Sequence, residues 1–592
     1  MKNLVAIGET PRIHSRQRTI RIAFHAGVLI LSAAVSGTAI AQQKPRQPPL
    51  DPYQTEKNID ALKTERQRAR RSPVQLPKVA HPEISTDTRP LFKLTAVSVT
   101  GASILSGDVI AGTYRPYIGK TVSKADLATI AVNISDRYRD AGYFLSRAIV
   151  PPQDVKGGRI RVRVIEGTIA DVVFKGEGVD EFGIRPMLDA VVAEHPARLQ
   201  TLERQLLLVN DRPGVSITDT ALEEIGKTSG RFRLIVYLKT WRIGTLLGAS
   251  NWGTPAVGPL QIYSVSAFNS IFAGGDSFGL NLSTVPDTPQ ELGFGQLSYD
   301  VPIGLSGARI GATALYSDVQ PGDYRKAFND HIKTDAVAVR ASIDPLQSRK
   351  SALRLTAVAG FSNVSERDSN RTIYNDHIRT VALAADYKLH DDFGGWNYLN
   401  VLYRQGVGAF GASRSGDAYL SNSNASGIFS IIDFSFAHYR NLSDAVSVKF
   451  SSAGQWASSP LLTSQQFYIG GPIYGRGYYS GDLSGDNGIA GALELRFDQK
   501  LKDGFLKSYQ LYGFIDGGAV WNHGAARDDV SSLSSAGAGV RFYFPDEFLA
   551  DFTFAAPVTY HSPTSIYHGL RFLFSLSKTF KVCPHRIDMR CS

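Results

Sequence analysis

From about residue 240 almost to the end of the chain, apolar and polar residues alternate with a period of two. The pattern is clearest where three apolar residues alternate with three charged ones: Leu493, Glu494, Leu495, Arg496, Phe497 and Asp498. Similar stretches occur at 381–389, 446–456, 540–544 and 570–580. A soluble sandwich also alternates, but lipid outside and water inside demand long unbroken strands, and only a closed barrel leaves no unpaired backbone in a bilayer. The pattern predicts a mainly β fold with a transmembrane antiparallel β-barrel of about 16 strands over residues 240–580.

Two regions before the barrel mix helical and strand patterns. The first, residues 91–167, is predicted to contain a strand at 92–99, a helix between Ser123 and Gly142, and strands at 143–150 and 160–164. Ser123 followed by Asp126 is a helix-start signal, and the apolar residues at 127, 130, 134 and 138 then have helical spacing. The second region, 168–239, is predicted to contain a strand at 172–174, helices at 185–192 and 202–209, and strands at 221–225 and 232–238. The repetition predicts two consecutive small α+β modules.

The N-terminal segment carries processing and linker signals. Basic residues precede an apolar run at 22–35, and Ala39-Ile40-Ala41 then offers a small-x-small cleavage pattern, so residues 1–41 are predicted to be a signal peptide. The alternative is a membrane anchor, for which the run is shorter than the ~20 residues a spanning helix needs. Residues 42–90 form a Pro-rich linker around a polar, basic helix at 55–71. Such a helix is either a solvated linker or an element that sits in a water-filled cavity and plugs it.

Charge and cysteine content narrow the function classes. The net charge is +10, but residues 1–80 hold 14 Lys and Arg against 5 Asp and Glu, so the excess lies at the N-terminus and argues against a nucleic-acid partner. The two cysteines, Cys583 and Cys591, lie in or next to the tail at 581–592, and whether they pair stays open. The 12 histidines show no ligand spacing, so neither a metal site nor a cofactor is expected.

Two short motifs resemble catalytic signatures. Residues 275–279 match the Gly-x-Ser-x-Gly elbow, which needs a strand–turn–helix context, but the residues that follow continue as a strand. Gly-Lys-Thr at 119–121 and 226–228 lacks the earlier glycine of a phosphate-binding loop. The chain is therefore predicted not to be an enzyme.

Two further motifs fit together inside a barrel. The first is Gly475-Arg476-Gly477-Tyr478 and the second is Phe514-x-Asp516-x-Gly518. If Leu511 faces lipid, the strand period places Phe514 and Asp516 on the lumen side. An arginine on a loop tip can then form a charge-assisted hydrogen bond with an aspartate on the wall, and flanking glycines let the loop approach closely.

With these motifs, and with a set of residues in the two modules, the chain resembles the outer-membrane transporters (TpsB) of two-partner secretion, the haemolysin and haemagglutinin exporters with POTRA modules. The module residues that carry the resemblance are Tyr143, Pro152, Gln153, Glu166, Gly167, Asn210, Asp211, Pro213 and Gly214. The resemblance implies an Arg476–Asp516 contact with Phe514 packed beside it. The family has valine where this chain has Gly475, a departure that predicts a looser loop tip.

The resemblance further implies a protein translocase of the bacterial outer membrane, with its POTRA modules in the periplasm. Residues 91–167 and 168–239 would capture an unfolded partner exoprotein (an adhesin, haemolysin or similar protein), and the barrel would conduct it outward. The barrel-assembly machinery and outer-membrane lipid are the other expected partners. Two alternatives remain: a barrel-assembly factor, which as a rule carries three to five modules, and a passive porin or ligand receptor.

Overall fold

The computed structural model describes residues 50–51, 53–60, 74–77, 85–226, 229–502, 504–524, 530–559 and 569–583. The predicted signal peptide and Cys591 lie outside these ranges. Of the helix predicted at 55–71, residues 54–60 are described and are helical, and 61–71 lie outside. Among the described helices, none is both long and apolar enough to cross a membrane.

The first module packs helices on one face of a small sheet. Its elements are β1 (Pro90–Lys93), β2 (Ala96–Thr100), α2 (Gly107–Tyr114), β3 (Thr121–Ser123), α3 (Lys124–Asp140), β4 (Arg147–Ile149) and β5 (Arg159–Ile165). The main sheet has the order β2-β5-β4, and β1 pairs with β3. Helix α3 begins as predicted, since the Ser123 side chain and Asp126 form a reciprocal capping box. Its apolar stripe buries Ile130, Ile134 and Tyr138 against the inner face of β5.

Two strands of the first module differ from the prediction. The strand expected at 92–99 is divided into β1 and β2, because the buried Leu94 leaves the line of the strand and pairs through its backbone with Gly119 and Lys120. The strand expected at 143–150 is confined to Arg147–Ile149. The residues before it turn, and Phe144 and Leu145 are buried in the core of the second module.

The second module has the same arrangement of helices on a three-stranded sheet. Its elements are β6 (Thr168–Lys175), the 3₁₀ helix η2 (Arg185–Leu188), α4 (Asp189–Ala193), α5 (Leu199–Asn210), β7 (Val215–Glu224) and β8 (Arg231–Thr240), with sheet order β6-β8-β7. The predicted helix at 185–192 is therefore a 3₁₀ turn followed by a short α-helix. Helix α5 buries Leu202 and Leu206 against Leu234 of the central strand.

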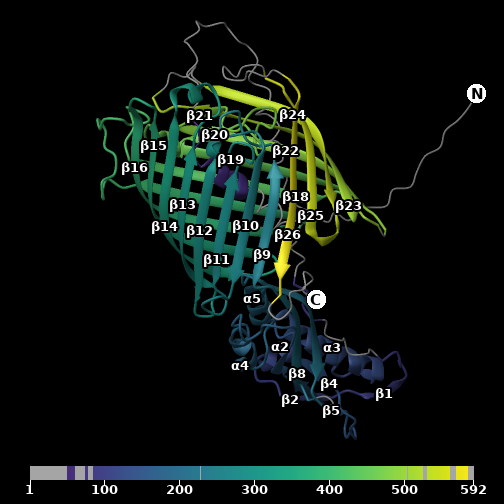
Figure 1. Ribbon diagram of the computed structural model, residues 1–592. Helices are drawn as coiled ribbons and strands as arrows, with labels where there is room; N and C mark the ends of the chain where they lie inside the picture. The colour runs from purple at the N-terminus through teal and green to yellow at the C-terminus, as the bar shows by residue number, and fades with distance from the viewer. Residues whose placement is uncertain are drawn as a thin grey trace, which may run out of the picture. The chain divides into compact units, whose positions relative to one another are not determined.

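Sixteen antiparallel strands close into a barrel, as the alternation predicted (Figure 1). They are β9 (Ile243–Ser250), β10 (Gln261–Asn269), β11 (Ser277–Thr284), β12 (Gly293–Ile303), β13 (Ala308–Val319), β14 (His331–Gln347), β15 (Ser351–Arg367), β16 (Thr372–His390), β17 (Gly395–Gly406), β18 (Ser430–Asn441), β19 (Val446–Ala457), β22 (Asn487–Lys500), β23 (Ser508–Trp521), β24 (Ser531–Tyr543), β25 (Phe548–Pro557) and β26 (Arg571–Val582). The barrel closes where β26 pairs with β9, from Ser575 opposite Ser250 to Val582 opposite Ile243.

The two faces of the barrel strands differ in polarity, as the alternation predicted. Leu493 and Leu495 of β22 are exposed on the outside, whereas Glu494 between them is only 2% exposed. The same holds in β23, where Leu511 and Ile515 face outward and Asp516 is buried. Because period-two alternation turns every second side chain to the lumen, the polar groups gather inside the barrel.

Candidate functional site

The connection between β19 and β22 folds into the barrel. It contains a small hairpin of β20 (Phe467–Ile469) and β21 (Leu483–Gly485). Ile469 and Tyr478 from this connection pack against inward-facing side chains of the wall, among them Val520 and Leu533. The loop therefore lies on the inner surface formed by β22, β23 and β24.

The tip of the loop contacts the wall through Arg476. Its Nε lies 2.8 Å from Oδ2 of Asp516, and the two side chains are 10% and 0% exposed. The guanidinium carbon lies 3.7 Å from the centre of the Phe514 ring, a close cation–π contact. The contact that the resemblance implies is thus present, with Phe514 beside it. Its role in transport stays a prediction.

Asp516 also binds the backbone of the loop. Its Oδ1 accepts hydrogen bonds from the amides of Gly475 at 3.1 Å and Arg476 at 3.3 Å, and from the hydroxyl of Ser535. Gly475 has a φ of +89°, and a Cβ there would lie 2.5 Å from Cδ1 of Leu533. The left-handed backbone brings the Gly475 amide to the carboxylate, and Leu533 packs where a side chain would stand; a looser loop tip at this glycine stays a prediction.

The other three motif residues, Gly477, Tyr478 and Gly518, also pack closely against the barrel wall. Gly477 lies so close to the wall that a Cβ would stand 2.7 Å from the backbone nitrogen of Pro557. The Tyr478 hydroxyl bonds to the backbone oxygen of Thr559, and Arg571 donates to the backbone oxygen of Tyr478. Gly518 is required in β23 because a Cβ would lie 2.6 Å from the backbone oxygen of Ile489. The motif residues are therefore all packed against strands β22 to β26 or the connection before β26.

A wider ionic network surrounds the pair. The buried Glu494 accepts hydrogen bonds from Arg476 at 3.1 Å, from Arg496 at 2.7 Å and from Arg541 at 2.9 Å. Arg541 also bonds to Asp551 at 2.9 Å. Three guanidinium groups thus share three carboxylates in a buried cluster. Removing one member would leave a buried charge uncompensated, at a cost of about 3–5 kcal/mol.

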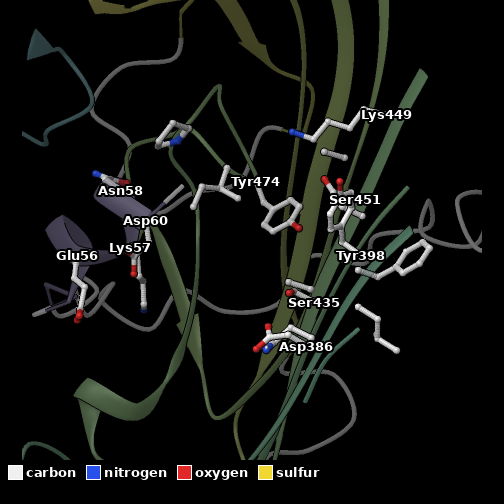
Figure 2. Close-up of a pocket in the computed structure, with 18 of the residues that line it drawn as sticks. Glu56, Lys57, Asn58, Asp60, Asp386, Tyr398, Ser435, Lys449, Ser451 and Tyr474 are labelled. Carbon is white, nitrogen blue, oxygen red and sulfur yellow. Dashed lines mark hydrogen bonds between the residues drawn. The ribbon is translucent and has the colours of Figure 1, made fainter. Parts of the chain in front are cut away.

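The lumen beside this cluster is partly filled by the N-terminal helical segment. A cavity of about 2250 Å³ is lined by wall residues, by the loop and by residues 53–60 (Figure 2). The Tyr53 hydroxyl bonds to Ser362 of the wall, and Glu56 accepts a hydrogen bond of 2.5 Å from Gln296. Ile59 is buried in an apolar cluster with residues of β12 to β14. In Figure 2, Tyr474 of the loop lies between the helical residues and the wall side chains Ser435 and Ser451.

The model of one protein family matches most of the barrel and the strand before it. The family is described as haemolysin secretion/activation protein ShlB/FhaC/HecB, and it matches residues 236–542, more than half of the chain. The chain belongs to this family. A second model, described as POTRA domain, ShlB-type, matches residues 92–167.

Curated relatives and solved structures agree with this family. The chain is 23% identical to the heme/hemopexin transporter protein HuxB of Haemophilus influenzae, over 80% of this chain and 84% of the relative. It is 21% identical to the outer membrane transporter CdiB of Dickeya dadantii, over 92% and 98%. The solved structure of CdiB from Escherichia coli has a TM-score of 0.70 at 19% identity, covering 89% of this chain and 98% of that one. This ShlB-type protein is an outer-membrane transporter of two-partner secretion, with its POTRA modules in the periplasm. Members of the family are transporters, not enzymes, and work with a secreted exoprotein.

In the first POTRA module of this ShlB-type protein, the residues of the resemblance do not form one surface. Glu166 accepts hydrogen bonds from the amide and hydroxyl of Ser103, from the amide of Ile104 and from the Tyr138 hydroxyl. Although burial opposes ionisation, these hydrogen bonds lower the pKa of Glu166 below its usual range. Gly167 has no room for a Cβ, which would stand 2.4 Å from the backbone oxygen of Leu145.

The Gln153 side chain forms the hydrogen bonds with β5 that a further residue of β4 would otherwise form. Pro152 follows the end of β4 and is exposed, and the Gln153 side chain then bonds to both backbone groups of Arg161, at 2.8 Å to its oxygen and 2.7 Å to its nitrogen. The amide side chain therefore continues the pairing of β5 where β4 has ended. Capture of substrate by these residues is untested and stays a prediction.

The remaining residues lie either at contacts between successive parts of the chain or in the turn that leads into β7. The Tyr143 hydroxyl accepts a hydrogen bond of 2.9 Å from Arg198 of the second module. The Asn210 side chain accepts the amide of Ile217 at 2.9 Å, and Asp211 accepts a 2.5 Å bond from Gln347 of β14. Pro213 precedes Gly214, whose φ of +75° suits the turn into β7. Tyr143 and Asp211 thus contact the next part of the chain, whereas Asn210, Pro213 and Gly214 shape the turn into β7.

Sequence reasoning missed several members of the site. Glu494, Arg496 and Arg541 stood out only as polar positions of alternating strands, because no local motif marks them. Arg212 was passed over inside the turn motif, yet it is buried and donates to the backbone oxygens of Phe182 at 3.0 Å and Gly274 at 2.8 Å. Burial lowers its pKa from the usual value. A buried arginine has no signature in a single sequence, since its partners are backbone groups of distant segments.

Proposed function

We propose that this transporter exports one exoprotein through its barrel, and that the loop carrying Arg476 and the helical residues 54–60 together close the resting lumen. The observation that supports the proposal best is the seating of the loop: one buried arginine binds both Asp516 and Glu494, and Asp516 also binds two loop amides. A loop held this firmly in a lumen suits a channel that must stay shut between transport events. A passive porin has no need of such a closure.

Capture in the periplasm would precede transport. The POTRA modules at 91–167 and 168–239 would bind the unfolded partner as an added strand, a common mode of recognition at an exposed sheet edge. Strand β2 offers such an edge, since it is terminal in the sheet order β2-β5-β4. Folding of the partner at the cell surface would supply the energy. Signal-peptide cleavage after residue 41 and insertion into lipid by the barrel-assembly machinery would come before these steps.

Only the names of the relatives indicate which class of exoprotein this transporter exports. HuxB is named a heme/hemopexin transporter protein and CdiB an outer membrane transporter. By analogy, the partner of this chain would be a large exoprotein such as an adhesin, a haemolysin or a haem-acquisition protein. The chain itself would perform no chemical reaction on it.

Secretion of the candidate partner tests the proposed closure. Cells would express either the wild type, Arg476→Ala or, as a control, Arg414→Ala, which removes an exposed arginine of the connection between β17 and β18. With barrel levels matched by heat-modifiable mobility, Arg476→Ala is expected to reduce secretion strongly, and Arg414→Ala to leave it unchanged. Normal secretion by Arg476→Ala would mean that the contact is structural and would contradict the proposed role.

A further inference from the structure

Three arginines lie in a row on the outer face of the first POTRA module. Arg159, Arg161 and Arg163 are exposed alternate residues of β5, while the residues between them are buried against the core. None of the three side chains forms an ion pair with a residue that the structure describes. Like charges at this spacing repel one another, so a negatively charged ligand bound to this face would offset the repulsion.

The strand beside this row leaves the guanidinium groups uncovered. In the parallel pair of β2 and β5, the arginines stand opposite Ala96, Ser98 and Thr100, which are short and exposed. Strand β2 is an edge of its sheet, so its outer backbone groups are open to a further strand. On the other side of β5, the Gln153 side chain already occupies the backbone of Arg161. The edge that runs along the arginine row and is open to an added strand is therefore that of β2.

The position of the arginine row relative to β2 indicates which side chains an added strand should carry. Side chains of an extended strand alternate between faces, and strands lie roughly 4.8 Å apart. Every second residue of a strand added to β2 would face the arginine row across the short β2 side chains. Carboxylates at those positions could form charge-assisted, bidentate hydrogen bonds with the guanidinium groups.

We propose that the first POTRA module binds an extended segment of the exported partner that carries Asp or Glu at every second position, added as a strand to the free edge of β2 with its carboxylates on Arg159, Arg161 and Arg163. The inference rests on the proposed capture function and adds to it the chemical class of the captured segment.

The distribution of charge along the chain favours an acidic segment of the partner as the strand added to β2. Residues 91–167 hold 11 Lys and Arg against 6 Asp and Glu, whereas residues 168–239 hold 9 against 11, so the attraction for an acidic segment belongs to the first module. The linker at 61–84 holds 6 Lys and Arg against 2 Glu, so like charge disfavours the chain's own linker as the ligand.

Peptide binding to the full-length protein in detergent tests the proposal. The probes are three labelled peptides of equal length: one alternates Glu and Val, one alternates Lys and Val, and one has the composition of the first with its Glu residues in a block. Fluorescence anisotropy would give the affinity of each at low and high salt. The alternating acidic peptide is expected to bind tightest, and salt to weaken its binding.

Two triple variants with equal charge change separate the arginine row from net charge. Arg159→Glu, Arg161→Glu and Arg163→Glu together should weaken the alternating acidic peptide about tenfold or more and improve binding of the alternating Lys peptide. The control combines Arg115→Glu, Lys120→Glu and Arg137→Glu, which are exposed residues away from β5, and should leave both affinities near wild type. The row changed to Gln in place of Glu should give an intermediate loss.

Three results would overturn the proposal: equal binding of blocked and alternating acidic peptides, unchanged binding by the Glu variant of the row, or equal losses in the two triple variants. The last would indicate general attraction by net charge, such as attraction to an anionic lipid surface. Failure of the capture function is recognised separately, since a chain lacking 91–167 would then still secrete its partner.

Discussion

At the scale of single residues, the position of the loop on the barrel wall depends on backbone conformations that only glycine adopts easily. Gly470, Gly471 and Gly475 have φ values of +106°, +89° and +89°. These conformations bend the tip so that two successive amides and one guanidinium reach the same carboxylate of Asp516. A residue that departs from the family motif is thus accommodated by the surrounding packing.

Replacing Gly475 by Val, the residue typical of the family, is therefore expected to unseat the loop in this chain. The left-handed backbone and the contact with Leu533 should cost about 1–3 kcal/mol, enough to raise the unseated fraction about fivefold to more than a hundredfold. Trypsin cleavage after the buried Arg476 in the purified protein measures this fraction.

Gly524→Val is the matched control, since Gly524 has a φ of +77° but no atom within 4 Å of its Cβ position. It should not change cleavage after Arg476. Equal cleavage of Gly475→Val and wild type would mean that the loop adapts to valine without leaving the wall.

At the scale of elements, short segments are held in position by a few contacts each. The segment 101–106 is tied to helix α3 by Glu166 through four hydrogen bonds. The helical residues 54–60 are anchored in the lumen by Ile59 and by polar contacts of Tyr53 and Glu56. An element with few anchors can leave its place when one of them is lost.

The first of these anchors should be sensitive to acid. Because the pKa of Glu166 is lowered in the folded protein, its contribution is complete above its usual value of 4.5 and is lost as pH falls below that value through the lowered pKa. The protection of the amides of residues 101–106 against hydrogen exchange, relative to their intrinsic rates, should therefore fall in wild type as the pH drops below the usual value of 4.5. Glu166→Gln should remove that dependence, whereas Glu177→Gln, an exposed glutamate of the second module, should keep it. An identical pH response in both variants would refute the assignment.

The second anchor can be tested by conductance. Ile59→Glu places a charge in the apolar cluster of β12 to β14, so the helical segment is expected to leave the lumen. Single-channel recordings should then show long open periods, against mostly closed traces for wild type. Ile118→Glu, the same change at an exposed position of the first module, serves as the control and should stay mostly closed. If the wild type is already open throughout, the closure proposed for the resting state is wrong.

At the scale of the whole molecule, the proposed function predicts that transport needs both the modules and the barrel, whereas insertion needs only the barrel. Deletion of residues 91–167 removes the first POTRA match but none of the sixteen strands. We expect a heat-modifiable barrel in the outer membrane and secretion reduced to background, because the partner is no longer captured. Secretion of the partner at the wild-type rate would contradict the capture role of that module.

The sequence alone predicted the barrel and its approximate number of strands, because a bilayer forces strict alternation and forbids open edges. It also predicted the Arg476–Asp516 contact, through motifs that resemble a known family. Tertiary structure decided the register of strand pairing, since a shift of two residues preserves every face. That register places Glu494 beside Phe514 and Arg541 beside Gln510, and so creates the ionic cluster. The arginine row of β5 was visible as alternation, but only the sheet order revealed the free edge beside it.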